Sequence, residues 1–306
     1  MKKLCTIYTN CQGNVIEKFL QHHPKFQEEY DSLFFQIDAF SSSVPMSEDL
    51  KSRLRQTSLF IYMIIAPDSP MLKKQVEQNI LTEEQAIEYQ TDSIKRMLPD
   101  GAISISIPNV HFEGYHVEYC REPRHDLTRS ARFPNGLFGY GNRTLIKLIK
   151  QNQPLTRDGI TKIIKQLNNK MLYSSEEIYS FFRRSLYLLR EKEKVCDVKV
   201  SDFILNNFTS KRLFHAANHP SSHIFNYLIE EIFKKLGYEM YPFFNLDWFS
   251  NHQVPISPCI INHYNLGFMG ENPTYLIEDL SKDQRFTHDE YWTMYITTLY
   301  QDMLRL

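Results

Sequence analysis

Glycine is scarce in this chain, with 10 among 306 residues, and neither G-x-G-x-x-G nor G-x-x-x-x-G-K-[ST] occurs. Both signatures place several glycines in one turn so that the backbone can approach a phosphate closely. Their absence excludes the common dinucleotide-binding and P-loop nucleotide sites.

The chain also lacks an excess of charge of either sign. Lys and Arg number 35 against 36 Asp and Glu, which leaves a net charge of -1. General nucleic-acid binders depend on a basic face, so we expect no nucleic-acid partner. A local basic pocket for a small phosphorylated ligand remains compatible with this balance.

Cysteines are few and scattered, and no C-x-x-C pair occurs. The five are Cys5, Cys11, Cys120, Cys196 and Cys259. An odd number without paired spacing predicts neither a disulfide framework nor a Cys-rich zinc site, and favours a reducing cytoplasm. His219 and His223 have the i,i+4 spacing of metal ligands, but no H-E-x-x-H motif accompanies them. We therefore expect no metal.

Long hydrophobic runs are absent as well. The longest run, Leu59–Ala66, falls far short of the roughly 20 residues of a membrane span. The opening Met1–Lys3 is followed by a stretch, Leu4–Asn10, that is too short and too polar for a signal peptide. These features predict a cytoplasmic protein with no transmembrane segment.

What the chain does contain is a series of short apolar runs separated by helical stretches. The runs predicted as strands are Leu4–Thr9, Phe34–Phe40, Leu59–Ala66 and Ala102–Ile107. They are continuous rather than alternating, which is typical of a parallel sheet buried on both faces. Helices are predicted over Val15–His22 and, in two pieces, over Met71–Leu98, where Thr82–Gln85 forms a capping box that restarts the helix.

The rest of the chain reads as mostly helical. Residues 109–142 are irregular, and 143–207 are predicted to be helical almost throughout. A strand-like Leu213–Ala217 precedes a helix over Ser221–Leu236 that Gly237 ends. The fold class expected is α/β, with a small, mostly parallel sheet at the N-terminal side and a large helical remainder packed on it. We expect a domain over 1–240, with an α/β part over about 1–110 and a loop and helical part over 111–240, and a C-terminal extension over 241–306 packed on it.

The turn after the first strand carries the strongest chemical signal. Asn10, Cys11, Gln12, Gly13 and Asn14 lie between the first strand and the first helix, where open α/β sheets place ligands. A helix N-terminus lowers the pKa of a thiol and offers backbone N–H groups to an oxyanion. Cys11 is therefore either a nucleophile or ligand contact, with the neighbouring amides binding substrate, or a buried cysteine in a polar turn.

Three segments in order resemble the WcbI-type capsular polysaccharide biosynthesis proteins, over roughly residues 3 to 240. They are Asn10-Cys11-Gln12 after the first strand, SISIPNVHFEGYH ending at His116, and Leu188–His219 with its closing Asn-His-Pro. The sequence departs from the family at Val117-Glu118, where Pro-Asp is expected, so the resemblance assigns no role to an acid there.

The resemblance implies a function. Proteins of this family are described as binding coenzyme A and as acetyltransferases that act on bacterial surface polysaccharide. It therefore implies acetyl-CoA as substrate and a sugar or polysaccharide acceptor as partner, with peripheral association with the assembly machinery. Cys11 would lie at the thioester.

Acyl transfer needs a base, and the histidines are the candidates. His219 is the first choice because Asn218-His219-Pro220 lies at a predicted helix entrance, with Asn218 as a further substrate contact; His116 is the second. His215 and His223 are weaker candidates. His111 and His125 only share the irregular segment, and we interpret them as structural.

Coenzyme A carries a 3′-phosphate and a pyrophosphate, so its site should offer basic side chains. Arginines are dense in and next to the irregular segment. Our candidates for phosphate contacts are Arg121, Arg124, Arg129, Arg132 and Arg143.

Two routes and two other functions stay open at this point. Cys11 attacks the thioester covalently, or a histidine activates the sugar hydroxyl for direct transfer while Cys11 only lines the site. If water replaces the sugar, the same residues make an esterase-like hydrolase. A non-catalytic module that binds CoA or a nucleotide in a polysaccharide assembly complex is the third reading.

Overall fold

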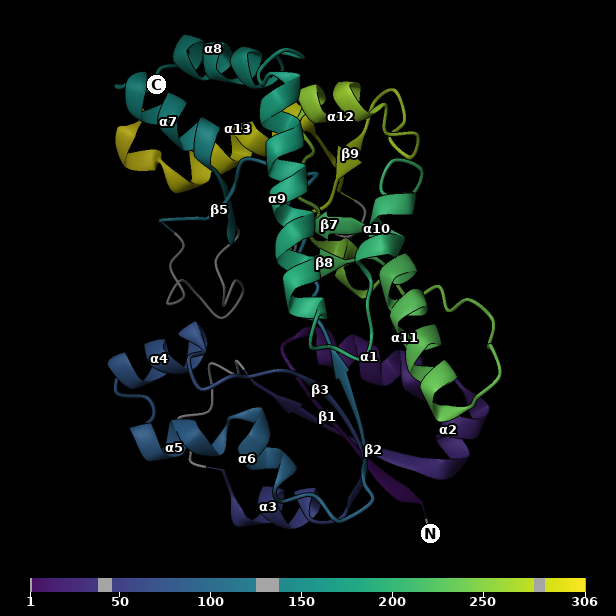
Figure 1. Ribbon diagram of the computed structural model, residues 1–306. Coiled ribbons are helices and arrows are strands. Elements are labelled where there is room, and N and C mark those ends of the chain that lie inside the picture. Colours follow the sequence, from purple (N-terminus) through teal and green to yellow (C-terminus); the bar gives the residue numbers. More distant parts are fainter. Residues whose placement is uncertain (1, 38–45, 125–137, 278–283, 306) are drawn as a thin grey trace. The chain divides into compact units, whose positions relative to one another are not determined.

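The computed structural model describes residues 2–37, 46–124, 138–277 and 284–305 (Figure 1). The chain forms two compact units. Unit 1 comprises Met1–Val110, Leu189–Asp202 and Ile224–Asn245, and unit 2 comprises His111–Leu188, Phe203–His223 and Leu246–Leu306. Each unit is therefore assembled from three separate pieces of sequence. The expected division into a domain over 1–240 and an extension over 241–306 stays a prediction.

Unit 1 is built on a four-stranded parallel sheet in the order β2-β1-β3-β4. The strands are β1 (Lys3–Thr9), β2 (Tyr30–Gln36), β3 (Thr57–Met63) and β4 (Ile103–Ile107). β1 and β3 are the inner strands and are almost wholly buried, which explains their continuous apolar runs. The α/β fold class is confirmed.

Helices connect these strands. They are α1 (Gln12–Gln21), α2 (Pro24–Glu29), α3 (Glu48–Leu54), α4 (Pro70–Glu77), α5 (Glu83–Glu88) and α6 (Thr91–Lys95). The capping box is confirmed, because Gln85 N donates to Thr82 Oγ1 over 3.2 Å and Thr82 N donates to Gln85 Oε1 over 2.9 Å. The predicted two-piece helix over 71–98 is, however, three helices. Asn79, at φ 54°, separates α4 from α5, and Tyr89–Gln90 separate α5 from α6.

Two strand boundaries also differ from the prediction. β2 begins at Tyr30, four residues before the predicted start, and ends at Gln36, while residues 38–40 lie outside the described part. β3 begins at Thr57 and ends at Met63, so Ile64–Ala66 are not strand.

Unit 2 is mainly helical. Its elements, including those shared with unit 1, are β5 (Tyr119–Arg121), β6 (Tyr140–Asn142), α7 (Arg143–Gln151), α8 (Arg157–Leu167), α9 (Ser175–Glu193), α10 (Ser201–Asn207), β7 (Phe214–Ala216), β8 (His219–Pro220), α11 (Ser222–Leu236), η1 (Trp248–Asn251), α12 (Pro258–Tyr264), β9 (Thr274–Tyr275), β10 (Phe286–Thr287), α13 (His288–Leu299) and η2 (Gln301–Met303). The helical run over 143–207 and the stop at Gly237, at φ 68°, are confirmed. The irregular segment contains an ordered antiparallel ladder between β5 and β6.

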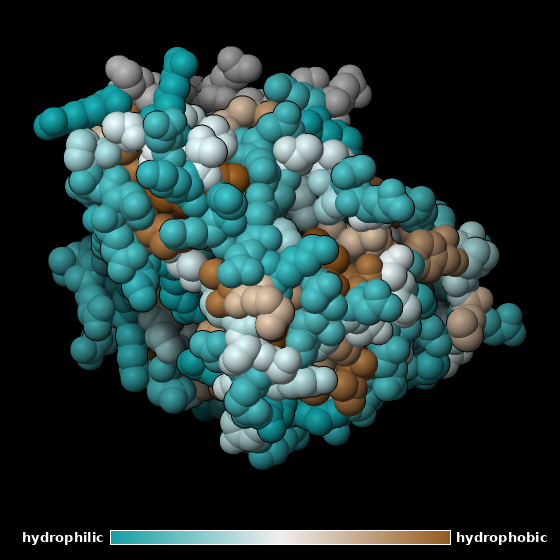
Figure 2. Space-filling view, turned by 90° about the horizontal axis from the view of Figure 1, so that it is seen from above, coloured by the Kyte–Doolittle hydropathy of each residue, from teal (hydrophilic) through white to brown (hydrophobic). Residues whose placement is uncertain are grey.

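A second core fills unit 2. It gathers buried side chains from α7, α8 and α13, among them Leu145, Ile149, Ile163, Trp292 and Ile296. The three helices lie together in Figure 1. On the face drawn in Figure 2, hydrophobic residues form small patches among hydrophilic ones. Within the described residues, no helix combines the length and apolar character needed to cross a membrane, and all five cysteines are free thiols.

The close approach at Gly13 generates a prediction. A Cβ atom at this position would lie 2.1 Å from Thr9 Oγ1 and 2.2 Å from Phe34 Cε2, well inside contact distance. Gly13→Ala should therefore lower the free energy of unfolding by about 3 kcal/mol in urea titrations, because β1, β2 and α1 must separate. Gly270→Ala, where no atom lies within 4 Å of the new Cβ, is the matched control. Equal stability of the two variants would contradict this packing.

Candidate functional site

The turn between β1 and α1 is a compact polar structure centred on Asn10. Asn10 Oδ1 accepts a hydrogen bond from Gln12 N over 3.0 Å, and Asn10 O accepts one from Gly13 N over 2.9 Å. Two amides at the start of α1 are therefore engaged within the turn. A bound oxyanion would have to displace these contacts or use amides further along the helix.

Two side chains of the turn reach the end of β4. Gln12 is buried, and its Nε2 donates to Val110 O over 2.9 Å, while Asn10 Nδ2 donates to Asn109 Oδ1 over 3.2 Å. The carboxyl ends of β1 and β4 thus meet in one polar cluster, at the sheet edge where parallel α/β folds bind ligands. Asn109 was not among the sequence candidates. The one feature of the sequence that could have indicated Asn109 as a site residue is its position two residues after the end of β4.

Cys11 is the N-cap residue of α1 and is partly exposed, with no hydrogen bond from its side chain to the helix start. The other thiols are in less reactive surroundings. Burial raises the pKa of Cys5 and Cys120 and raises that of Cys196 to about 11, and Cys259 is buried. Because the thiolate is the nucleophile, these environments leave Cys11 as the strongest candidate. Asn14, in the first turn, is exposed.

In unit 2, His219 is held by two neighbours. Tyr140 Oη lies 2.8 Å from His219 Nε2 and donates to Asn218 Oδ1 over 2.7 Å. The His219 ring stacks on Phe249, with 4.5 Å between centroids and 12° between planes. β8, β6 and η1 therefore fix the position and the plane of the imidazole together.

This geometry predicts the tautomer of neutral His219. A phenol has one proton, and Tyr140 gives it to Asn218, so His219 Nε2 must carry the proton that it shares with Tyr140 Oη. The basic lone pair is then on Nδ1. No sequence signal links Tyr140 or Phe249 to His219, because they lie 79 and 30 positions away in the chain.

His215 and His116 are in different surroundings. His215 Nε2 lies 2.9 Å from Asp247 Oδ2, and Ser222 N donates to Asp247 Oδ1 over 3.2 Å. Burial nevertheless lowers the pKa of His215, against the effect of Asp247. Burial, helped by the charge of Arg212, lowers the pKa of His116 to about 3. Such an imidazole is a weak base at neutral pH, which favours His219 over His116.

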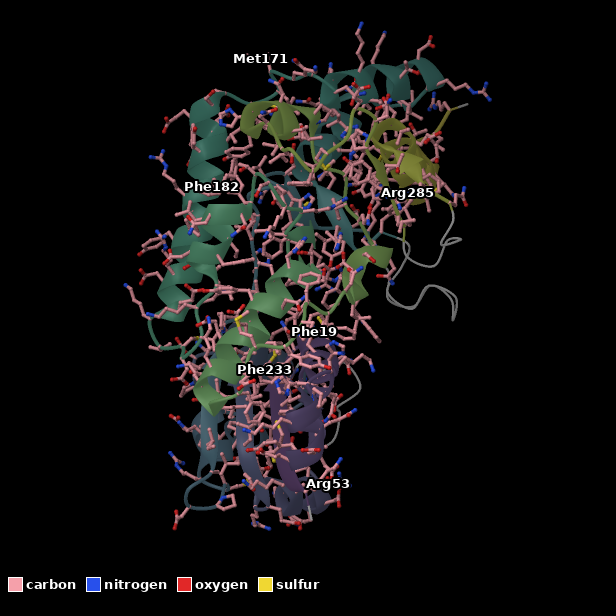
Figure 3. The ribbon with its side chains drawn as sticks, turned by 90° about the vertical axis from the view of Figure 1, so that its right-hand side faces the viewer. Phe19, Arg53, Met171, Phe182, Phe233 and Arg285 are labelled. Carbon is pink, nitrogen blue, oxygen red and sulfur yellow. The ribbon has the colours of Figure 1, made fainter. Side chains whose placement is uncertain are left out.

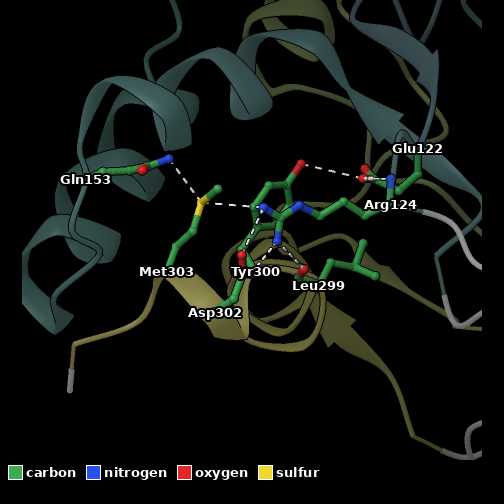
Figure 4. A network of polar contacts seen from close by, with 7 residues as sticks. All are labelled: Glu122, Arg124, Gln153, Leu299, Tyr300, Asp302 and Met303. Atoms are coloured by element: carbon green, nitrogen blue, oxygen red, sulfur yellow. Dashed lines mark hydrogen bonds and ion pairs between the residues drawn. The ribbon is translucent and has the colours of Figure 1, made fainter.

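The candidate arginines that the structure describes have different surroundings. Arg124 pairs with Asp302, donates to Leu299 O over 2.9 Å and lies 4.2 Å from the centre of the Tyr300 ring (Figure 4). Arg143 Nη2 donates to Val117 O over 2.9 Å. Arg121 is exposed on β5. Arg129, Arg132 and His125 lie outside the described residues. Across the described ranges, no group of three His, Cys, Asp or Glu side chains could hold a metal ion.

Comparisons with known proteins agree on one family. The family model described as the polysaccharide biosynthesis enzyme WcbI matches residues 4–240. A solved structure described as WcbI, a novel polysaccharide biosynthesis enzyme, in its native form without a disulfide bond between CoA and one of its cysteines, aligns with a TM-score of 0.74. It covers 98% of this chain and 91% of its own, at 18% identity, which shows the shared fold. Among curated proteins, none matches.

The tautomer of His219 can be measured directly. We expect ¹⁵N NMR of the neutral ring to show the proton on Nε2, and Tyr140→Phe to populate both tautomers because the acceptor oxygen is gone. Tyr119→Phe, in the same ladder, should leave the spectrum unchanged. A wild-type ring that carries its proton on Nδ1 would contradict the assignment.

Glu118 predicts a pH dependence of stability. Its side chain is buried, and burial raises its pKa from 4.5 to about 7. The folded state then binds the proton more tightly than the unfolded state, so stability is complete below pH 4.5 and falls as the pH rises through 7. Urea titrations should show a loss of about 3 kcal/mol between pH 4.5 and pH 8, absent in Glu118→Gln. Glu113→Gln is the control, because the hydrogen bond from His111 lowers the pKa of that carboxyl. A variant that loses as much stability as the wild type would contradict this role.

Proposed function

Because the chain belongs to the WcbI family of polysaccharide biosynthesis enzymes, we propose that it transfers an acyl group, in the simplest case acetyl, from coenzyme A to a sugar hydroxyl of a surface polysaccharide. The observation that carries the proposal is the placement of Cys11 at the start of α1, directly after a buried parallel strand. The related WcbI structure is described in terms of CoA and one of its cysteines. A thiol at a helix N-terminus is suited to the same pairing.

His219 is the general base in this proposal. Its Nδ1 lone pair, which is buried in this structure and has to become accessible when substrate binds, takes the proton of the sugar hydroxyl, while Tyr140 and Phe249 hold the ring in one orientation. Asn218 fixes the direction of the Tyr140 hydroxyl and so the tautomer. Positioned general bases contribute about 10²- to 10⁴-fold to the rate.

The covalent route has two steps. The Cys11 thiolate attacks the thioester carbonyl carbon, the bond from carbon to the CoA sulfur breaks, and CoA leaves as the thiolate. The sugar oxygen then attacks the acyl carbon as His219 takes its proton, and the bond to the Cys11 sulfur breaks. In direct transfer, the sugar oxygen attacks the CoA thioester itself, and Cys11 only lines the site.

Asn14 is exposed in the first turn of α1, and the amides of Asn10, Gln12 and Gly13 would have to exchange their present partners in order to contact the carbonyl in either route. Their existing hydrogen bonds make the turn rigid before any substrate arrives. Of the candidate arginines, we propose Arg121 as a contact for the phosphates of CoA, because its side chain is exposed on β5. Arg124 and Arg143 already have partners within unit 2.

Calorimetric titration tests the CoA proposal. We expect wild-type protein to bind CoA and acetyl-CoA with a dissociation constant below about 1 mM. Cys11→Ser should keep acetyl-CoA binding but form no mixed disulfide with CoA under oxidising conditions. Cys196→Ser, which removes another partly exposed thiol, should behave as wild type in both assays. Absence of heat at millimolar CoA would refute the proposal.

Kinetics separate the two routes. If Cys11 is acylated, incubation of His219→Ala with acetyl-CoA should leave an acetyl group on the protein by intact mass, because the second step lacks its base. His219→Ala should also lower kcat by about 10²-fold or more with little change in KM, whereas His263→Ala should not. A Cys11→Ser variant with full kcat would establish direct transfer. Turnover of acetyl-CoA that is independent of any sugar would indicate a hydrolase instead.

A further inference from the structure

Unit 1 contains a cavity at the opposite end of α1 from Cys11. Its volume is ≈ 160 Å³. Its walls are formed by Phe19 of α1, by His22 at the end of that helix, by residues 226–234 of α11 and by the segment 238–244. Phe19 and Phe233 are marked in Figure 3 on their two helices. All the lining residues belong to unit 1.

The segment 238–244 is an arch fixed at both ends. Gly237, at φ 68°, ends α11 and turns the chain back. At the far end, Asn226 Nδ2 donates to Phe244 O over 3.0 Å, and Phe244 N donates to Asn226 Oδ1 over 2.8 Å. Near the start, Tyr238 Oη donates to Glu29 over 3.0 Å. These contacts keep the cavity open in the absence of a ligand, which lowers the entropic cost of binding.

Aromatic rings line the cavity. The His22 ring stacks on Phe244 with 4.0 Å between centroids and 10° between planes. Tyr241 meets the edge of His22 at 5.0 Å, and Phe19 meets the edge of Phe244 at the same distance. Around the opening, Met240 and Phe243 are 71% and 52% exposed. Such concentrated apolar exposure marks a binding surface rather than a solvated loop.

The charged groups in the lining of this cavity disfavour an anionic ligand. Glu230, Glu239 and Lys234 are the ionisable side chains with formal charge in its lining. Lys234 is already paired with Glu230 at 2.9 Å and with Glu231 at 2.7 Å. The carboxylate of Glu239 therefore gives the cavity a negative balance, which repels phosphates and sugar acids. Carboxylates accept hydrogen bonds from neutral hydroxyl groups.

We propose that this cavity binds one neutral sugar ring of a polysaccharide. An aromatic face suits the C–H face of a pyranose, and carboxylates suit its hydroxyls. A cavity of about 150 Å³ holds one benzene molecule, so the ≈ 160 Å³ found here takes no more than one ring, and the hydroxyl groups of a pyranose would lie at the opening. The exposed Tyr241 and Phe243 extend the aromatic surface for the neighbouring residues of the sugar chain.

The cavity is separate from the thiol. α1 runs from the Cys11 cap to Gln21, and at a rise of 1.5 Å per residue the 11 steps from Cys11 to His22 span about 16.5 Å. The cavity would therefore hold the acceptor chain away from its reacting hydroxyl. The role as an acceptor site rests on the proposed function, whereas the binding of a neutral sugar ring is argued from the cavity itself.

Saturation-transfer NMR tests the proposal on the full chain. The probes are methyl glucoside, methyl galactoside and methyl mannoside at about 10 mM, with glucuronic acid and cyclohexanol as comparison ligands. We expect transfer from the protein to at least one neutral glycoside, at least fivefold weaker transfer to glucuronic acid, and no competition by coenzyme A. Tyr241→Ala should lower the signal at least fivefold, and Tyr187→Ala, at an exposed tyrosine of α9, should not.

Three results would overturn the proposal. They are no transfer to any of the neutral glycosides, equal transfer in wild type and Tyr241→Ala, and displacement of the glycoside by cyclohexanol, which would indicate a purely apolar site. Since the measurement detects occupancy alone, an inactive transferase does not affect it. Loss of CoA binding together with intact glycoside binding would refute only the acyl-transfer proposal.

Discussion

The buried amide of Gln12 is the interaction on which the candidate site of unit 1 depends. Its Nε2 donates to Val110 O at the point where the chain leaves the first piece of unit 1. A buried amide without this partner would be costly, so the contact fixes the start of α1 against the end of β4. The position of Cys11, one residue earlier, is set by a hydrogen bond in which the thiol takes no part.

The histidines of unit 2 differ in burial and in the side chains that surround them. His116 and His215 are buried, and burial lowers the pKa of both rings. His219 instead meets a phenol and an aromatic face that orient its ring. The surroundings therefore differ between these rings: two are buried with a lowered pKa, and the third is held in a fixed plane by an aromatic neighbour.

The sequence predicts the elements whose signals are local. β1, β4, the capping box at Thr82 and the stop at Gly237 each follow from a few adjacent residues. The start of β2 does not, because Asp31 lies on an edge strand and interrupts the apolar run. The break at Gln90 between α5 and α6 also has no glycine or proline to mark it.

In the candidate site too, the sequence indicates only the residues whose signals are local. Cys11 and His219 follow from motifs at the ends of elements, whereas Tyr140 and Asn109 do not, because their contacts join residues 79 and 99 positions apart. For Arg124, the local sequence suggests a ligand contact, whereas the structure gives its side chain a partner within the protein. Its sequence neighbourhood indicates a phosphate contact, but Asp302, from the end of the chain, already balances its charge.

The assembly of each unit from three pieces has a consequence for biosynthesis. The last piece of unit 1 ends at Asn245, although its sheet is complete by residue 107. During synthesis, more than a hundred further residues are translated after β4 before the last piece of unit 1 is available to pack on the sheet. Part of the apolar surface of β1 to β4 is uncovered until then. Neither unit is encoded by one continuous stretch of the chain, so cutting the sequence at any single position does not release one unit intact.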